Sequence, residues 1–206
     1  MKTEIIPVIH MLNQNQVITN VKTCIECGIK KVFLINHSVS RDELIDCALR
    51  VKKKYPKLWV GINMLGVPTQ NALNYEFQLD GLWCDATITS LDAQLVRNFK
   101  GMFFGGLAFK YQPQPKDLKF ACDDAIKATD VATTSGVGTG KAANIDKIKL
   151  IREYLGEHPM AIASGVSVDN IDNYKDIVDY LLVASSITSP GEIIYKGELI
   201  KLVNKL

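Results

Sequence analysis

Four side chains capable of acid/base chemistry each follow a short apolar run of the sequence: His10, His37, Asp85 and Lys110. A carboxyl group held among apolar walls can have its pKa raised into the working range of a general acid or base, so we predict Asp85 as the proton-transfer group. Lys110 could serve as an electrostatic clamp or, if desolvated, as a Schiff-base amine. His10 and His37 could carry protons or bind a metal. Plainer roles stay open, because Asp85 could bond a neighbouring loop and Lys110 could be a surface lysine.

A turn rich in small residues gives the strongest signal for a ligand. Ser164 and Gly165 open the segment SGVSVDN, which is predicted to lead from a strand into a helix. Backbone N–H groups beside small side chains can approach an anion, and a helix N-terminus adds a favourable partial charge. Ser185 and Ser186 follow the next strand and are also small and polar. We predict a phosphate site at these two turns; a tight turn with a Ser or Asp N-cap is the alternative that needs no ligand.

A glycine-rich loop, SGVGTGK, ends at Lys141. It is not a P-loop, because Ala142 stands where a Ser or Thr should hold magnesium, and its glycine spacing does not fit the dinucleotide fingerprint. We expect Gly138, Thr139 and Gly140 to fold over a bound anion with Lys141 as the counter-charge; a solvated loop is the alternative. The scattered His and Asp residues lack metal-ligand spacing, so we predict no metal and no other cofactor.

The elements that must position these residues are strands whose ends meet. Short apolar runs rich in β-branched residues recur along the chain with helix-period segments between most of them, which is typical of repeated βα units. Strands are predicted at residues 5–10, 31–36, 59–64, 81–86, 102–109, 130–134, 160–163 and 180–184. These eight units, with a last helix within 192–206, predict a single (β/α)8 TIM barrel over residues 1–206. An open doubly wound sheet is disfavoured, because no glycine-rich nucleotide loop follows the first strand.

The barrel predicts where the site lies, since chemistry in this fold occurs at the carboxyl ends of the strands. The acid/base groups and the small-residue turns all fall at these ends. Asn36, Asn63 and Thr134 also close predicted strands, and we include them as ligand-binding residues. Together these side chains predict a polar ring around one small ligand.

Capping signals define two of the predicted helices. Ser40 with Glu43 makes a capping box at the start of one of them. Asn144 is predicted to cap a helix over residues 145–155, and Gly156 fits the left-handed position after its end.

Composition excludes several classes of protein. The chain has 206 residues, of which 47% are hydrophobic and 22% charged, with a formal net charge of +2. The near-zero charge and the scattered lysines give no footprint for nucleic acid. No apolar run approaches the ~18–20 residues that span a bilayer, and the first residues lack a signal peptide. We therefore predict a cytoplasmic protein whose partner is a phosphorylated small molecule, with no nucleic acid and no membrane; helix faces could also form a homo-oligomer.

The sequence holds five cysteines, an odd number that argues for reduced thiols. Cys24 and Cys27 form a C-x-x-C, but they fall late in a predicted helix rather than at its start, where thiolates are stabilised. Helix packing is the favoured role for this pair, with redox or metal chemistry as the alternative.

The loop that ends at Lys141, followed by the SGVSVDN turn at Ser164, resembles the S/T-G-x-x-T-G and S-G-V-x-x-x-N pair of BtpA/SgcQ-like proteins. Residues 7–12 and 60–65 are similar to the first and third strands of that family. The resemblance implies a phosphate-binding-type TIM barrel, and members of the family have been linked to photosystem I biogenesis. The family tends to close strand eight with a glycine-containing turn, where this chain has Ser185 and Ser186.

The SGVSVDN turn also resembles that of phosphoribosylanthranilate isomerase and related sugar-phosphate barrels. The catalytic cysteine expected near the end of strand one in that isomerase has no counterpart, because His10 occupies the region. Two functions stay open from the sequence. The first is an enzyme on a phosphorylated sugar or nucleotide-like metabolite, such as an isomerase, lyase or transferase. The second is a noncatalytic, BtpA-like barrel that binds a metabolite or assists assembly of a partner.

Overall fold

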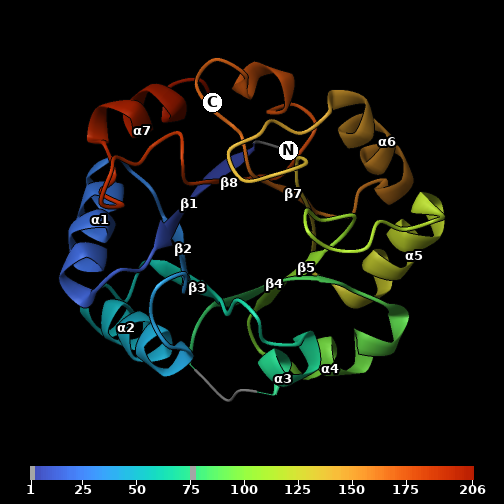
Figure 1. The fold of residues 1–206 in the computed structure, drawn as a ribbon, viewed down its shortest axis with the longest axis horizontal. Helices are drawn as coiled ribbons and strands as arrows, with labels where there is room; N and C mark the ends of the chain where they lie inside the picture. The colour runs from blue at the N-terminus through green and yellow to red at the C-terminus, as the bar shows by residue number, and fades with distance from the viewer. Residues whose placement is uncertain (1–2, 75–77) are drawn as a thin grey trace.

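The computed structural model describes residues 3–74 and 78–206, and its parallel strands close into a barrel in the order β1 to β8 (Figure 1). The strands are β1 (Glu4–His10), β2 (Lys31–Ile35), β3 (Trp59–Asn63), β4 (Gly81–Thr87), β5 (Met102–Gly106), β6 (Val131–Thr134), β7 (Met160–Ala163) and β8 (Tyr180–Val183). The α-helices are α1 (Gln14–Glu26), α2 (Arg41–Lys54), α3 (Thr69–Leu73), α4 (Ala93–Asn98), α5 (Leu118–Ala128), α6 (Ile145–Leu155) and α7 (Lys196–Val203). Short 3-10 helices occur at η1 (Ser90–Asp92) and η2 (Ile171–Asn173). The predicted TIM barrel is confirmed.

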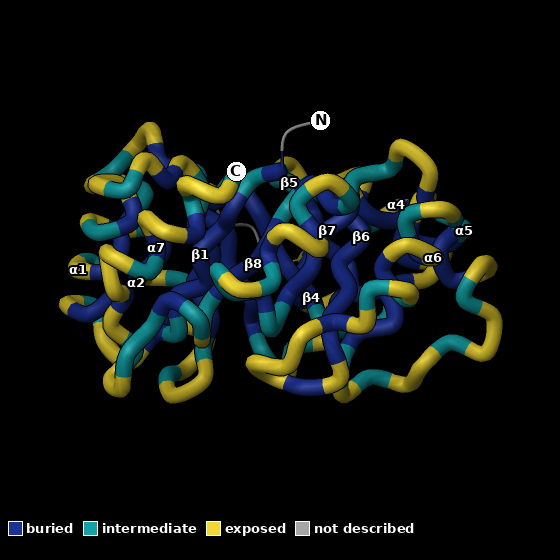
Figure 2. Tube along the Cα trace, turned by 90° about the horizontal axis from the view of Figure 1, so that it is seen from above, coloured by how far each residue is buried: buried dark blue, intermediate teal, exposed yellow. Residues whose placement is uncertain are grey.

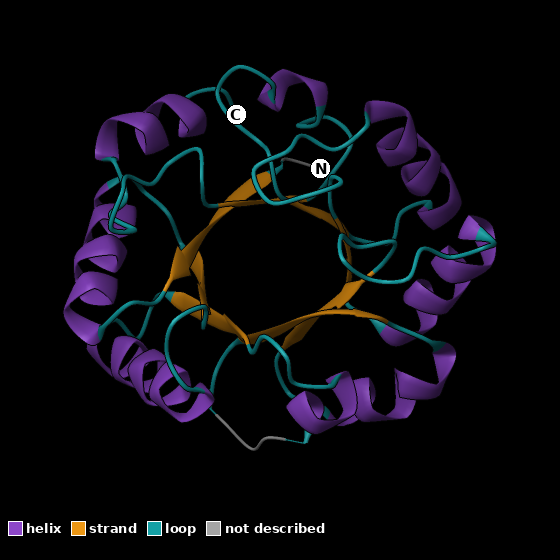
Figure 3. Ribbon diagram, viewed as in Figure 1, coloured by secondary structure: helices purple, strands orange, loops and turns teal. Residues whose placement is uncertain are grey.

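The barrel has two apolar layers, because successive side chains of a strand point to opposite faces. On β1, Ile6 and Val8 face the barrel interior, whereas Ile5 and Ile9 pack in the larger cluster that includes the helices. Figure 3 shows the helices as a ring outside the strands. Both faces of the sheet are therefore covered, which explains why the strand segments read as nearly continuous apolar runs.

Aromatic side chains fill the interior. The Phe33 ring meets the edges of Phe104 and Trp83, with ring centroids 5.0 and 5.7 Å away. Gly61 makes room for this packing, since a Cβ there would lie 2.4 Å from the Phe33 ring. The interior is a packed core rather than a pore, so space for a ligand remains at the strand ends.

At the amino-terminal end of the barrel, an aspartate stands one residue before each of β4, β6 and β8: Asp80, Asp130 and Asp179. Each carboxylate accepts a hydrogen bond from a backbone N–H near the start of the preceding strand. The donors are Val60, Phe103 and Met160, at 2.8, 2.7 and 2.7 Å respectively. These bonds tie strands together in pairs, which fits the stabilising role of this end of a TIM barrel.

Two of these aspartates also form ion pairs that repeat from one half of the barrel to the other. Lys52 of α2 contacts Asp80 at 2.6 Å and donates to the Leu58 carbonyl. Arg152 of α6 contacts Asp179 at 2.7 Å and donates to the carbonyl of His158. The amino-terminal end therefore carries the same clamp twice, half a barrel apart.

Most predicted element ends agree with the structure within two residues. The strand predicted at 102–109 is an exception, because it ends at Gly106, and the last helix, predicted within 192–206, covers only Lys196–Val203. The turn after β7 leads only into the three-residue helix η2, so the prediction of a following α-helix was wrong. The Ser40 capping box, the helix Ile145–Leu155 and its Asn144 cap are confirmed.

The tube in Figure 2 shows the strands buried, the helices outside them with buried and exposed residues in alternation, and both ends of the described chain on one side of the barrel. All five cysteines are free, and Cys24 is buried in the helix layer as predicted. Burial raises the pKa of the Cys24 and Cys27 thiols, which disfavours thiolate chemistry there. Within the described ranges, the helices are too short or too polar to span a bilayer.

Candidate functional site

A cavity of about 530 Å³ opens at the carboxyl ends of the strands, and residues from the loops around most of the barrel line it. Ten of the fifteen predicted site residues lie in its wall: His10, His37, Asp85, Lys110, Thr139, Gly140, Ser164, Gly165, Ser185 and Ser186. Apolar groups such as Val8, Ile35 and Trp83 form part of the same wall. The site therefore combines titratable groups with an apolar surround, which is typical of small-molecule sites.

A β-bulge in β4 places Asp85. The register of β4 against β5 shifts between Cys84 and Thr87, so the segment that contains Asp85 bends out of the ladder. Gly106 of β5 lies directly under this bend. A Cβ on Gly106 would be 2.2 Å from the Asp85 carbonyl oxygen, closer than any real contact. The bulge and the glycine together aim the carboxylate of Asp85 toward the cavity.

Opposing effects act on the pKa of the Asp85 carboxyl group. Burial raises its pKa, whereas a hydrogen bond from Asn63 Nδ2 (3.0 Å) and the positive charge of Lys110 lower it. Desolvation is the largest of these causes, so the net pKa is above that of a free aspartate. A carboxyl group whose pKa is raised in this way is a candidate for proton transfer.

Lys110 reaches the cavity from the loop after β5, not from the strand itself. Its backbone N–H donates to Ser135 Oγ (2.7 Å), and Ala108 takes a left-handed φ of +46°. The half-buried Lys147 fixes the same loop, because its ammonium donates to the carbonyls of Ala108 (2.6 Å) and Ser135 (3.1 Å). Burial lowers the pKa of Lys110, and the negative charge of Asp85 opposes that change. The two groups are thus perturbed in opposite directions within one cavity.

His10 and His37 meet at the ends of β1 and β2. Their ring centroids are 4.5 Å apart, and His10 Nδ1 lies 3.1 Å from Glu192 Oε2. Burial lowers the pKa of His37, and the neighbouring His10 lowers it further, so His37 favours the neutral form. Among the residues that the structure describes, no three His, Cys, Asp or Glu side chains gather closely enough to hold a metal ion.

The turns after β6 and β7 pack against each other. Gly165 has a φ of +68°, and a Cβ there would lie 2.2 Å from the Lys141 backbone. Ser164 Oγ accepts a hydrogen bond from the Gly136 N–H (3.2 Å). Asn170 closes the turn by accepting from Ser167 N–H (2.8 Å). Glycine at 165 therefore serves loop packing, and the short η2 does not supply the helix N-terminus that we expected beside a phosphate.

Trp83 and Ser186 both line the cavity, and each carries a buried polar atom with no hydrogen-bond partner within the described chain: Nε1 and Oγ respectively. Buried donors are normally satisfied, so these two are exceptions beside the cavity. Trp83 lies two residues before Asp85 on the same strand, which puts both side chains on the interior face. That spacing is a signal in the sequence, although we did not include Trp83 among the predicted site residues.

Five predicted residues, all in the described part of the chain, lie outside the cavity lining: Asn36, Asn63, Thr134, Gly138 and Lys141. Asn36 accepts from the Leu65 backbone N–H (2.9 Å), and Asn63 supports Asp85 from behind. Thr134 is fully buried. Asn36 and Asn63 therefore hold neighbours of the cavity wall in place.

Tyr111 and Glu192 complete the surroundings of the cavity and were absent from the predicted set. Tyr111 lines the cavity with a φ of +60°, and its hydroxyl accepts from the Thr139 backbone N–H (3.3 Å). Glu192 stands behind His10. Nothing in the local sequence marks either residue, since both contacts join loops that are distant in the chain.

Comparisons with known proteins support the fold. The sequence matches no family model and no curated protein sequence. Solved structures of similar shape include the native KDPGal structure, at 12% identity over 99% of this chain and 94% of that one, with a TM-score of 0.73. The chain has the fold of a TIM barrel. A phosphoribosyl anthranilate isomerase from Thermus thermophilus is 13% identical over 98% of both chains (TM-score 0.72). A tryptophan synthase from Mycobacterium tuberculosis is 9% identical over 98% of this chain and 92% of that one (TM-score 0.72).

Proposed function

We propose that this TIM barrel is an enzyme that binds a phosphorylated small metabolite and moves a proton with Asp85. The observation that carries the proposal is the pair of Asp85 and Lys110 in one cavity, with the pKa of the acid raised and that of the base lowered by burial. Groups perturbed in opposite directions in a concave site are typical of acid/base catalysis. The site lies at the carboxyl ends of the strands, where barrel enzymes carry their chemistry.

Each residue has a role in this proposal. Asp85 gives or takes the proton, and Lys110 stabilises negative charge that develops on the substrate. The backbone at Gly140, Ser164 and Ser186 surrounds the phosphate, and the Ser186 hydroxyl, which is buried without a partner within the described chain, turns to donate to it. Isomerase, lyase and transferase reactions all use a proton-transfer group of this kind.

Three further observations agree with this proposal. The cavity volume of about 530 Å³ is within the range of small-molecule sites. One of the similar folds belongs to a phosphoribosyl anthranilate isomerase, a protein named for a phosphoribosyl compound. The five free cysteines favour a reducing compartment, which in our proposal is the cytoplasm.

The first test is thermal stability of the purified protein against sugar phosphates, nucleotides and inorganic phosphate. A ligand at 100 times its Kd stabilises the folded state by about 2.7 kcal/mol, which shifts the Tm by several degrees. Ser186→Ala should reduce the shift, whereas the matched control Ser90→Ala, on the exposed start of η1, should not. If no phosphate compound shifts the Tm at saturating concentration, the phosphate proposal fails.

The second test concerns turnover of the compounds that bind. Asp85→Asn should lower kcat by a factor of about 10² or more, while ligand binding persists. Asp46→Asn, which changes an exposed aspartate of α2, is the matched control. Unchanged turnover in Asp85→Asn would remove Asp85 from the mechanism.

A second candidate function is a noncatalytic, BtpA-like barrel that assists a protein partner. The observation in its favour is the exposure of apolar side chains on the loops beside the cavity: Val137 is 81% exposed and Tyr111 is 77% exposed. Apolar groups on exposed loops suit contact with another protein. Turnover of any compound in the panel that depends on Asp85 would decide against this alternative.

A further inference from the structure

The wall of the cavity opposite Asp85 holds a second titratable group, His10. In a closed ring of eight strands, β4 and β5 stand across the barrel from β8 and β1. Asp85 lies on β4 and Lys110 on the loop after β5, whereas His10 ends β1 on the other side. His10 lines the cavity, so a ligand that fills the space contacts titratable groups from opposite walls.

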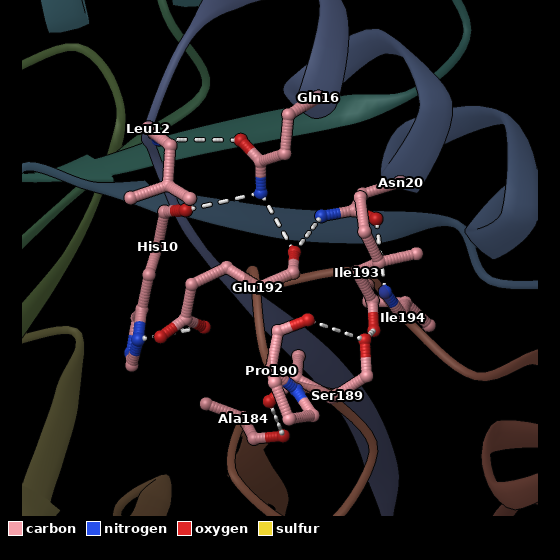
Figure 4. Close-up of polar contacts among 11 residues, drawn as sticks. His10, Leu12, Gln16, Asn20, Ala184, Ser189, Pro190, Glu192, Ile193 and Ile194 are labelled. Carbon is pink, nitrogen blue, oxygen red and sulfur yellow. Dashed lines mark hydrogen bonds and ion pairs between the residues drawn. The ribbon is translucent and has the colours of Figure 1, made fainter.

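Glu192 lies behind His10 and outside the cavity lining. Its Oε2 is 3.1 Å from His10 Nδ1, and the two side chains keep 33% and 17% of their surface exposed. Figure 4 shows the carboxylate of Glu192 turned toward the His10 ring. An imidazole whose Nδ1–H donates to a carboxylate is fixed in one tautomer, which leaves Nε2 as the proton acceptor on the far edge of the ring.

The backbone of Glu192 is held in place by a buried amide network. Its φ is +56°, a left-handed conformation that costs a non-glycine residue energy unless the surroundings impose it. Gln16 Nε2 and Asn20 Nδ2, both from α1, each donate to the Glu192 carbonyl at 2.7 Å. Asn20 also accepts from Ile194 N–H (2.9 Å), and Gln16 also donates to the His10 carbonyl (3.1 Å). The same network therefore holds His10 and Glu192 relative to each other (Figure 4).

We propose that Glu192 is a positioning residue, which accepts the Nδ1–H of His10 and so makes His10 the second proton-transfer group of the site. This inference rests on the proposed function, because it assigns His10 to the cavity in which Asp85 acts. The substrate then lies between an acid/base group on each wall, an arrangement that suits removal of a proton at one position and its return at another. His37 packs on the His10 ring and favours the neutral form, whereas the Glu192 carboxylate lies against His10 Nδ1.

The tautomer of His10 tests the positioning role without any substrate. Glu192→Gly removes the carboxylate but accepts the left-handed φ, so this variant should fold at least as well as the natural protein. Nitrogen-15 NMR of the histidine side chains at a pH of about 8.5, where a free imidazole is neutral, reports which nitrogen carries the proton. His10→Ala and His37→Ala assign the signals. His158, which bonds to Thr129 Oγ1 (3.0 Å) far from this cluster, is an internal control.

The expected result is Nδ1–H for His10 in the natural protein and a shift toward Nε2–H in Glu192→Gly, with His158 unchanged. Nε2–H in the natural protein, or an unchanged tautomer in the variant, would overturn the proposal. For a compound that is turned over, Glu192→Gly should lower kcat by about 10²-fold with little change in KM. An unchanged kcat would also overturn it. If Asp85→Asn leaves turnover intact, the proposed function of Asp85 fails separately, and the tautomer measurement still decides the role of Glu192.

Discussion

Replacement of Gly106 by alanine should destabilise the barrel and displace Asp85. The new Cβ would lie 2.2 Å from the Asp85 carbonyl oxygen and 2.6 Å from that of Ala86, and real Cβ atoms essentially never come closer than 3.0 Å. The two strands must therefore separate by about 0.8 Å in a close-packed region. Both obstacles are backbone atoms, so no side chain can rotate away. Overpacking of this kind costs about 1–3 kcal/mol, and we expect the upper part of that range.

The free energy of unfolding in urea measures this effect, and the Tm should fall by about 4–10 °C for a chain of this size. Gly197→Ala is a matched control, because Gly197 is in α7 and nothing lies within 4 Å of its added Cβ. That change should stabilise the protein by about 0.5–1 kcal/mol, since alanine favours helix over glycine. A Gly106→Ala protein as stable as the natural one would refute the explanation of how the β4 bulge is held.

Two further predictions concern other charged groups. Arg152→Met leaves the Asp179 carboxylate without its ion-pair partner and three carbonyls without their side-chain donor, so the free energy of unfolding should fall by about 3–5 kcal/mol. An unchanged urea midpoint would contradict the stabilising role of this ion pair. Asp85→Asn should stabilise the protein at neutral pH, because burial raises the folded-state pKa of Asp85 and ionisation there costs stability. The gain in the free energy of unfolding should vanish as the pH falls below the unfolded-state pKa of about 3.9. Urea unfolding between pH 3.5 and about 8 measures it, and a gain that stays constant over that range would contradict the prediction.

The sequence was sufficient to predict the architecture because the pattern of alternating strands and helices is local. Its main error at a strand end has a physical cause. The apolar run at 102–109 continues past Gly106, since Phe109 folds back into the barrel interior after the backbone leaves the sheet at Ala108. Hydrophobicity reports burial and not hydrogen bonding, so the strand looked longer than it is. The segment that ends at Asn170 was similarly predicted to lead into a helix, whereas the Asn170 side chain bonds back to Ser167 and Gly165 and so closes only the loop.

The ring of strand-end residues was predicted in part because a barrel brings those ends together. Asp85, Lys110, His10 and His37 all line one cavity, as the topology requires. Which strand-end residue points inward depends on details that spacing alone does not contain. Asn63, for example, ends β3 but lies behind the cavity wall and bonds to Asp85.

Glu192 shows the limit of sequence reasoning most clearly. Its partners come from the first strand and helix, far away in the chain, and its role depends on a left-handed backbone that no motif announces. A glutamate at a position that favours glycine became informative only once its conformation was seen.

The repeated clamp at the amino-terminal end has a consequence for how the protein can change. Asp80 and Asp179 accept equivalent hydrogen bonds in the two halves of the barrel. At the carboxyl end the equivalent positions differ, because β3 ends with Asn63 and β7 is followed by Ser164. The stabilising contacts of the amino-terminal end are thus present twice, whereas the residues that line the cavity differ from one half of the barrel to the other. Substitution of a cavity side chain such as Asp85 or Ser186 leaves both clamps intact, so new specificities can be tried at such positions without loss of the bonds at the amino-terminal end.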